Sequence, residues 1–120
     1  MDLFIDTFKA LSDKTRLRIM IALLAARREL CICEIMDTLK LAQYNVSRHV
    51  KELKNAGLIQ ERKEGRFVFY GLIPPAHGFH KNLLNTLKNI ENTVINDDIV
   101  RLGKRLSLRK NDRCIVGMRK

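Results

Sequence analysis

The sequence lacks any apolar stretch long enough to cross a membrane. Its longest apolar run covers residues 19–26, whereas a membrane-spanning helix needs about 20 such residues. The chain starts with MDLFIDTF, which is acidic and amphipathic, unlike the basic start of a secretory signal peptide. We therefore expect a cytoplasmic protein that has no membrane partner.

Cysteine is also scarce, since the chain contains only Cys31, Cys33 and Cys114. An odd number of cysteines in a reducing compartment argues for free thiols or metal ligands rather than for a disulfide framework. The chain has neither the βαβ pattern nor the C-x-x-C motif of a thiol oxidoreductase. We therefore expect a protein that is not an enzyme.

Acidic residues are outnumbered by basic ones. The chain has 23 Lys and Arg against 13 Asp and Glu, a formal net charge of +10. Such an excess favours a polyanionic partner, of which nucleic acid is the usual one. Ribosomal and membrane-surface proteins share this signature, so charge alone does not identify the partner.

Apolar spacing predicts a mainly helical amino-terminal half. A first helix over residues 3–11 precedes a core helix capped by Ser12 or Asp13, and a short helix follows the cysteine pair. Residues 42–58 then combine a narrow apolar stripe with a wide polar face, and Gly57 stands where a helix-ending glycine is expected.

The period then changes from helix to strand. Residues 59–63 and 66–72 flank Glu64-Gly65, which predicts a tight β-hairpin. A long helix from residue 76 to about 96 and a further short helix are expected next. The expected organisation is a winged helix-turn-helix DNA-binding and dimerisation domain over residues 1–96, followed by a short helix and basic tail over residues 97–120 that carries Cys114.

Two helices joined by a turn, followed by a hairpin with basic residues near its tip, are typical of a winged helix-turn-helix. The expected fold class is mainly α with a β-hairpin wing (α+β), with helical dimerisation elements at both ends. The apolar stripe that begins at Phe79, together with Phe4 and Phe8, favours a homodimer, although an intrachain core helix is the open alternative.

The polar face and the hairpin supply the candidate DNA-binding residues. Gln, Asn and Arg have the geometry to contact base edges, whereas Ser and Lys more often contact phosphates. A merely solvated face is the alternative. The candidate set is Gln43, Tyr44, Asn45, Ser47, Arg48, His49, Lys63 and Arg66.

LSDKTRLRIM at residues 11–20, ELCICEI at residues 29–35 and the segment over residues 46–72 together resemble the ArsR/SmtB family of bacterial and archaeal metal-responsive repressors. LSDKTRLRIM at residues 11–20 resembles the family's "LsDptRlrIL" opening, and residues 46–72 look like its recognition helix and wing. ELCICEI at residues 29–35 resembles the ELCVCDL thiolate box of the arsenic- and cadmium-sensing branches. The resemblance implies a transcriptional repressor that binds a near-palindromic double-stranded DNA operator. One departure is Ala42-Gln43-Tyr44, where the family often has Ser-Gln-Pro.

The same resemblance implies that Cys31 and Cys33 bind a soft ion as thiolates. As(III) or Sb(III) is the favoured inducer, with Cd(II) or Pb(II) as alternatives and no organic cofactor. The family's third box cysteine is replaced here by Met36, and a thioether is a weak ligand beside a thiolate. Cys114 is therefore the tentative third metal ligand, from its own or the partner subunit.

The spacing of the pair suggests how an ion would act. Residues two apart point about 200° away from each other in a regular helix. We therefore expect Cys31 and Cys33 to bind one ion only if the first helical turn unwinds, which would disrupt the DNA-competent arrangement. The start of a helix also favours thiolates, because its unsatisfied N–H groups stabilise negative charge.

Other interpretations stay open at this point. The cysteine pair could be two small buried hydrophobic residues, or it could form a redox or persulfide sensor together with Cys114. A metal-free DNA-architectural protein is a further alternative. His77 and His80 suggest the zinc branch of the family, but later ligand positions fall near Leu87 and Ile90, so structural or surface roles are expected for both histidines.

Overall fold

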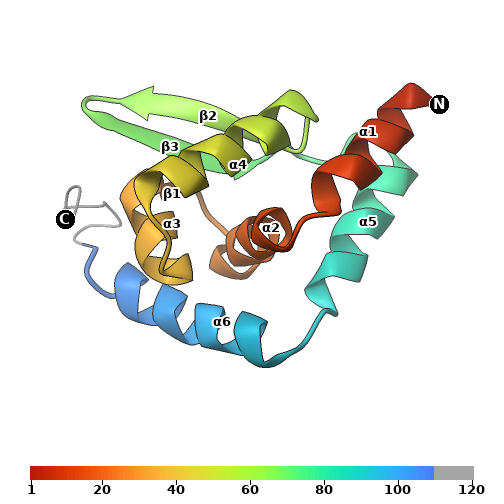
Figure 1. Cartoon of the computed structure of the whole chain (residues 1–120). Helices are drawn as coiled ribbons and strands as arrows, with labels where there is room; N and C mark the ends of the chain where they lie inside the picture. Colours follow the sequence, from red (N-terminus) through yellow and green to blue (C-terminus); the bar gives the residue numbers. More distant parts are fainter. Residues whose placement is uncertain (110–120) are drawn as a thin grey trace.

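The computed structural model describes residues 1–109, which form six helices and a three-stranded antiparallel sheet (Figure 1). Two helices joined by a turn and followed by a β-hairpin confirm the predicted winged helix-turn-helix. None of the helices within residues 1–109 is both long and apolar enough to span a bilayer. The elements are α1 (Asp2–Leu11), α2 (Lys14–Ala26), β1 (Leu30–Cys31), α3 (Ile32–Leu39), α4 (Gln43–Asn55), β2 (Ile59–Glu64), β3 (Phe67–Leu72), α5 (Gly78–Lys88) and α6 (Thr93–Leu106).

Helix α2 is the centre of the core, as its apolar residues on nearly every side predicted. Figure 1 shows the other helices and the sheet arranged around it. Its cap is Asp13, whose side chain accepts a hydrogen bond of 3.0 Å from the Arg16 backbone N–H. The buried residues of α2 are Ile19, Met20, Ile21, Ala22, Leu23 and Ala26.

Helix α4 faces the core with the predicted stripe of Val46, Val50 and Leu53, which are at most 2% exposed. The helix ends as expected at Gly57, which has a φ of 78°. The Leu58 N–H bonds to the carbonyl of Leu53 at 3.1 Å, and the Gly57 N–H bonds to that of Lys54 at 3.0 Å. These two bonds close a Schellman motif and direct the chain into the hairpin.

Gly57→Ala is expected to lower the free energy of unfolding by about 1–2 kcal/mol, because an L-residue is strained in the left-handed region. An added Cβ would meet no atom within 4 Å, so any loss of stability would come from backbone strain and not from a steric clash. Urea denaturation measures the change. Gly78→Ala is the matched control, because its Cβ would also enter open space but its φ is not positive. Equal losses in both variants would contradict the role assigned to Gly57.

The sheet has the order β1-β3-β2, and the hairpin register runs from Ile59 opposite Leu72 to Glu64 opposite Phe67. The turn is therefore Gly65-Arg66, one residue later than predicted, because Gly65 takes the positive φ of 60° at the first turn position. Strand β1 was not predicted, since two residues are too short to show a period. It places Cys31 opposite Phe69 in β3.

The prediction of one helix from residue 76 to about 96 is wrong. Helix α5 ends at Lys88, and α6 begins anew after Asn92, whose side chain accepts a 2.9 Å bond from the Ile95 N–H. An asparagine cap of this kind favours a new helix start over continuation. The expected boundary between residues 96 and 97 thus falls inside α6, which packs against α2 and α3 (Figure 1).

Candidate functional site

The two cysteine sulfurs already lie together at the start of α3. Cys31 is the N-cap residue, with extended backbone angles (φ −84°, ψ 166°), and Cys33 lies in the first turn. Their Sγ atoms are 2.9 Å apart, and the residues are 1% and 2% exposed. The expectation that the turn must unwind is therefore wrong, because the 200° separation applies only when both residues are helical.

Glu34 forms a capping box with Cys31. The Cys31 N–H donates to Glu34 Oε1 at 3.0 Å, while the Cys31 side chain faces the Glu34 N–H. A sulfur thus occupies the position usually taken by a Ser or Thr oxygen. Because helix N–H groups favour negative charge, this position favours a thiolate.

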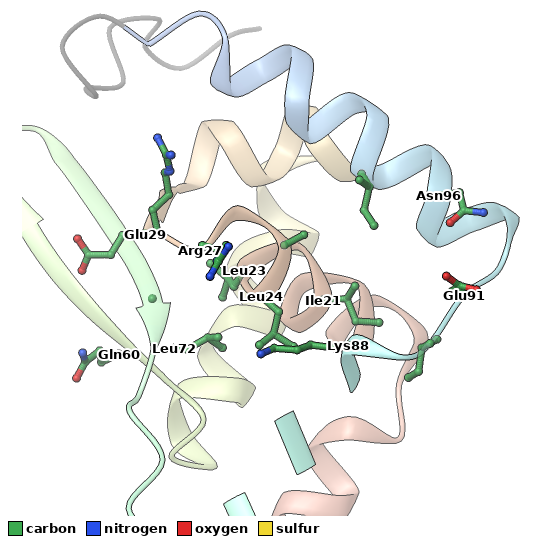
Figure 2. A pocket seen from close by; sticks show the side chains of 15 residues that line it. Ile21, Leu23, Leu24, Arg27, Glu29, Gln60, Leu72, Lys88, Glu91 and Asn96 are labelled. Carbon is green, nitrogen blue, oxygen red and sulfur yellow. The ribbon is translucent and has the colours of Figure 1, made fainter. Parts of the chain in front are cut away.

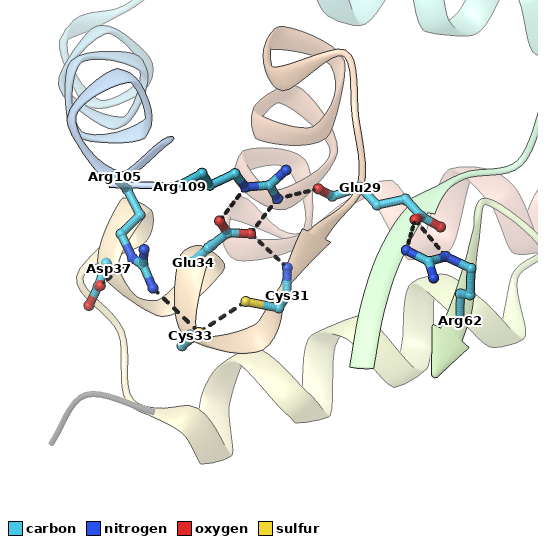
Figure 3. Close-up of polar contacts among 8 residues, drawn as sticks. All are labelled: Glu29, Cys31, Cys33, Glu34, Asp37, Arg62, Arg105 and Arg109. Carbon is cyan, nitrogen blue, oxygen red and sulfur yellow. Dashed lines mark hydrogen bonds and ion pairs between the residues drawn. The ribbon is translucent and has the colours of Figure 1, made fainter. Parts of the chain in front are cut away.

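Two arginines from the carboxyl-terminal end of the described chain reach the same turn of α3 (Figure 3). Arg109 donates to both carboxylate oxygens of Glu34 at 2.7 Å and to the Glu29 carbonyl at 2.8 Å. Arg105 donates to Asp37 at 2.7 Å and approaches Cys33 Sγ at 3.5 Å. These contacts could not be predicted from the sequence, because they join residues more than 65 positions apart.

Glu34 is fully buried yet ionised. Burial raises the pKa of its carboxyl. This effect is outweighed by the hydrogen bonds from Arg109 and the Cys31 N–H and by the charges of Arg109 and Arg105, so the pKa is lowered from its ordinary value of 4.5. A buried carboxylate with these partners keeps its charge at neutral pH.

The thiol pair borders a cavity of about 470 Å³ that reaches the candidate DNA-binding residues. Its lining consists of Cys31, Ile32, Cys33, Gln43, Arg66, Phe67 and Val68. Gln43 begins α4 and Arg66 lies in the hairpin turn. Among residues 1–109 no group of three Cys, His, Asp or Glu side chains is placed to hold a metal ion. The tentative third ligand, Cys114, lies outside the described residues.

Helix α4 and the hairpin lie on the same side of the molecule, opposite α6 (Figure 1). Of the candidate DNA-binding residues, Gln43, Tyr44, Ser47, Arg48, Lys63 and Arg66 are exposed and Asn45 is partly exposed. Tyr44 is 74% exposed, and the Arg48 guanidinium lies 5.9 Å from the centre of its ring. The exposed residues can contact another molecule without disturbing the core stripe of α4.

His49 is a correction to that set, because it is only 7% exposed. Its Nδ1 lies 3.2 Å from Arg16 Nη1 and 3.6 Å from an Asp13 oxygen. Burial lowers the pKa of His49, and the positive charges of Arg48 and Arg16 lower it further. The Asp13 carboxylate raises this pKa but does not outweigh them, so the ring is neutral near pH 7. Its spacing from Val46 placed it on the buried face, a signal that the sequence analysis missed.

His77 and His80 act as structural residues in α5. The Nδ1 of His77 accepts the His80 backbone N–H at 3.4 Å and caps the helix, which accounts for the H-x-x-H spacing. Phe79 packs edge-on against Phe4 and Phe8, with ring centres 4.8 and 5.7 Å apart. These contacts join α1 to α5.

The outer face of α1 is apolar and exposed. Phe4, Ile5 and Phe8 are 38%, 45% and 53% exposed. Three large apolar side chains on one short helix make a surface patch of the kind that marks a protein contact.

A second cavity, of about 650 Å³, lies beside α2 (Figure 2). Its apolar lining includes Ile21, Leu24 and Leu72, and Arg27 and Lys88 also border it. Within residues 1–109, no cysteine or histidine lines it, and it shares no lining residue with the cavity beside the thiol pair.

The chain is similar to known regulatory proteins. Residues 13–61 match the family described as "Bacterial regulatory protein, arsR family". The chain is 35% identical over 97 residues to the arsenic resistance transcriptional regulator ArsR1 of Pseudomonas putida, covering 81% of this chain and 75% of that protein. It is 42% identical over 65 residues to a cadmium resistance transcriptional regulatory protein CadC homolog of Staphylococcus aureus, covering 54% and 53%.

A solved structure shares the fold. It is the homodimeric winged helix-turn-helix DNA-binding domain of Mb0332 from Mycobacterium bovis, described as a possible ArsR-family transcriptional regulator. The match has a TM-score of 0.59 and 25% identity, and covers 72% of this chain and 76% of that domain.

Proposed function

Because the chain belongs to the arsR family of bacterial regulatory proteins, we propose that it is a DNA-binding transcriptional repressor controlled by its cysteine pair. Helix α4 enters the major groove through Gln43, Tyr44, Asn45, Ser47 and Arg48, and Lys63 and Arg66 of the hairpin contact the adjacent backbone or minor groove. The net charge of +10 supports a polyanionic partner. The protein acts on DNA in the cytoplasm.

The repressor is a homodimer. The exposed apolar face of α1, continued by Phe79 of α5, supplies a surface for a second copy. The homodimeric state of the Mb0332 domain supports this arrangement. Two-fold symmetry would place the two α4 helices about 34 Å apart, which suits a near-palindromic operator.

The cysteine pair binds a soft metalloid or metal ion, with As(III) or Sb(III) the best fit. The single observation that carries this proposal is the 2.9 Å separation of the Cys31 and Cys33 sulfurs. Two sulfurs that bind one ion at about 2.3 Å each are at most about 4.6 Å apart, so the pair can hold one ion with side-chain adjustment alone. Thiolates are the ligands that soft ions prefer.

Cys114 is the proposed third ligand. It follows Arg109, whose side chain contacts Glu34 and Glu29 beside the pair, by five residues. Five residues span up to about 17 Å, which is enough for a return to the thiols of the same or the partner subunit.

Ion binding releases the operator because the ion and the DNA use adjoining residues. The cavity beside the sulfurs is lined by Gln43 and Arg66, and β1 joins Cys31 to the hairpin strand β3. An ion that favours a different arrangement of these residues lowers DNA affinity by its differential affinity for the two states.

The test is a titration of the reduced full-length protein with arsenite. Thiolate–ion absorbance and the number of protected thiols are followed together with operator binding by fluorescence anisotropy. Three protected thiols would include Cys114 in the site, and two would assign it to Cys31 and Cys33. No protection by arsenite would overturn the arsenic assignment, and the same titration with Cd(II), Pb(II) and a persulfide then tests the alternatives.

Cadmium is the second candidate inducer, because the chain is 42% identical over 65 residues to the cadmium resistance regulator of Staphylococcus aureus. A persulfide or redox sensor that uses Cys31, Cys33 and Cys114 is the remaining alternative on the same site.

Arg48→Ala is expected to weaken operator binding by about 1–3 kcal/mol, because Arg48 is exposed on α4 and has the geometry to contact a base. Ion binding should not change, since Arg48 does not line the thiol cavity. Lys81→Ala, on exposed α5, is the control and should leave operator affinity nearly unchanged. Unchanged affinity of Arg48→Ala, measured by anisotropy, would remove this residue from the DNA contacts.

A further inference from the structure

We propose that Arg105 and Arg109 are positioning residues that hold the two thiols in place for the ion. This inference rests on the proposed soft-ion function and concerns residues outside the segment that matches the family, residues 13–61. Figure 3 shows the side chains of Arg105, in the last turn of α6, and of Arg109, in the segment after α6, reaching the first turn of α3.

Arg105 fixes Cys33. Its side chain is only 3% exposed, and its Nε donates to Asp37 at 2.7 Å. That bond orients the guanidinium so that Nη2 lies 3.5 Å from Cys33 Sγ. A buried guanidinium held in this position limits the rotation of the Cys33 side chain.

Arg109 fixes Cys31 through Glu34. Both Glu34 oxygens accept from Arg109 at 2.7 Å, and Oε1 also accepts the Cys31 N–H at 3.0 Å. Because Glu34 is fully buried, removal of Arg109 would leave its carboxylate without these two charged hydrogen bonds in a site that water does not reach. The backbone of Cys31 is therefore held by a carboxylate that Arg109 holds in turn.

Each sulfur thus depends on one arginine, Arg105 in the last turn of α6 or Arg109 in the segment that follows this helix. Removal of groups that orient metal ligands typically costs 10- to 100-fold in metal affinity. The affinity of the thiol pair is therefore set in part by the carboxyl-terminal helix.

Arg101 provides a matched control on the same helix. It donates to Asp98 and to the Thr38 carbonyl, both at 2.8 Å, and thus holds the opposite end of α3. Arg101→Gln removes an arginine contact between α6 and α3 but leaves the cysteines untouched.

The test measures arsenite affinity for the reduced full-length protein and its Arg105→Gln, Arg109→Gln and Arg101→Gln variants. The first two are expected to bind about 10- to 100-fold more weakly, whereas Arg101→Gln should match the wild type. Arg105→Lys, which keeps the charge, should bind with intermediate affinity. If the Arg105 variants do not fold, Asp37→Asn replaces them. This change is at a partly exposed side chain and removes the carboxylate that orients the Arg105 guanidinium.

A second readout does not depend on the ion. In a Cys114→Ser background, dibromobimane becomes fluorescent only when it joins two thiols, so its rate reports how well the pair converges. The rate should fall in Arg105→Gln and Arg109→Gln and stay unchanged in Arg101→Gln. Unchanged rate and affinity in both would overturn the inference and leave the proposed function intact. A slower rate in a protein that binds no arsenite would support the inference and overturn the proposed arsenic function.

Discussion

Cys31→Ser is expected to bind operator as the wild type does and to lose the response to arsenite. The change removes one of two converging thiolates, and its effect should exceed the roughly 100-fold cost of losing an orienting group. Serine is itself a preferred N-cap residue, so the capping box with Glu34 and the start of α3 are retained. Anisotropy with labelled operator, with and without arsenite, measures both properties.

Cys114→Ser separates the pair from the tail. If Cys114 is the third ligand, this variant should respond at a higher arsenite concentration but still respond. Release of Cys31→Ser by the same arsenite concentration as the wild type would contradict the assignment of Cys31 as a ligand.

The second large effect concerns stability. Glu34→Gln is expected to lower the free energy of unfolding by about 3–5 kcal/mol, because it removes one partner of a buried ion pair. Glu34 is 0% exposed and the Arg109 side chain 6% exposed, so water compensates little for the lost charge. Urea denaturation at pH 7 measures the loss, and Glu91→Gln, at an exposed residue in the link before α6, is the control.

The loss should depend on pH with a definite sign. The pKa of Glu34 is lower in the folded protein than its ordinary value of 4.5. Its contribution is therefore fully present above about pH 4.5 and is lost as the pH falls through the folded pKa. The difference between wild type and Glu34→Gln should stay constant from pH 7 to about pH 5 and shrink in more acidic solution. A difference that grows on acidification would contradict an ionised Glu34.

Local sequence signals predicted the elements that depend on local chemistry. Asp13 caps α2, Gly57 ends α4, and Val46, Val50 and Leu53 are buried, all as the pattern indicated. Each of these features is specified by residues within about two helical turns, so period and capping rules suffice.

Some elements were not predicted because they depend on contacts between distant residues or because they are too short to show a period. Strand β1 exists because Cys31 pairs with Phe69, and no period can appear in two residues. His49 is a different case, because its position three residues after Val46 already placed it on the buried face of α4, where it contacts Arg16. The break before α6 depends on the Asn92 cap. The apolar stripe from Phe79 to Val94 is continuous across this position, so it predicted a single helix.

The candidate site was predicted in composition but not in geometry. The cysteines were identified, but their convergence depends on Cys31 being outside the helix. The arginines that hold α3 come from the other end of the chain, and a single sequence contains no signal for such pairs.

The pairing of β1 with β3 places Cys31 and Phe69 on one rung of an antiparallel ladder. Strand register is discrete, since a slip of one residue turns every side chain to the opposite face of the sheet. If Cys31 is displaced, its pairing with Phe69 therefore cannot shift gradually along the strand, and the two residues either stay paired or separate. A displacement of Cys31 would therefore affect the hairpin only when β1 separates from β3. Because these strands share only two residue pairs, little free energy is needed to separate them.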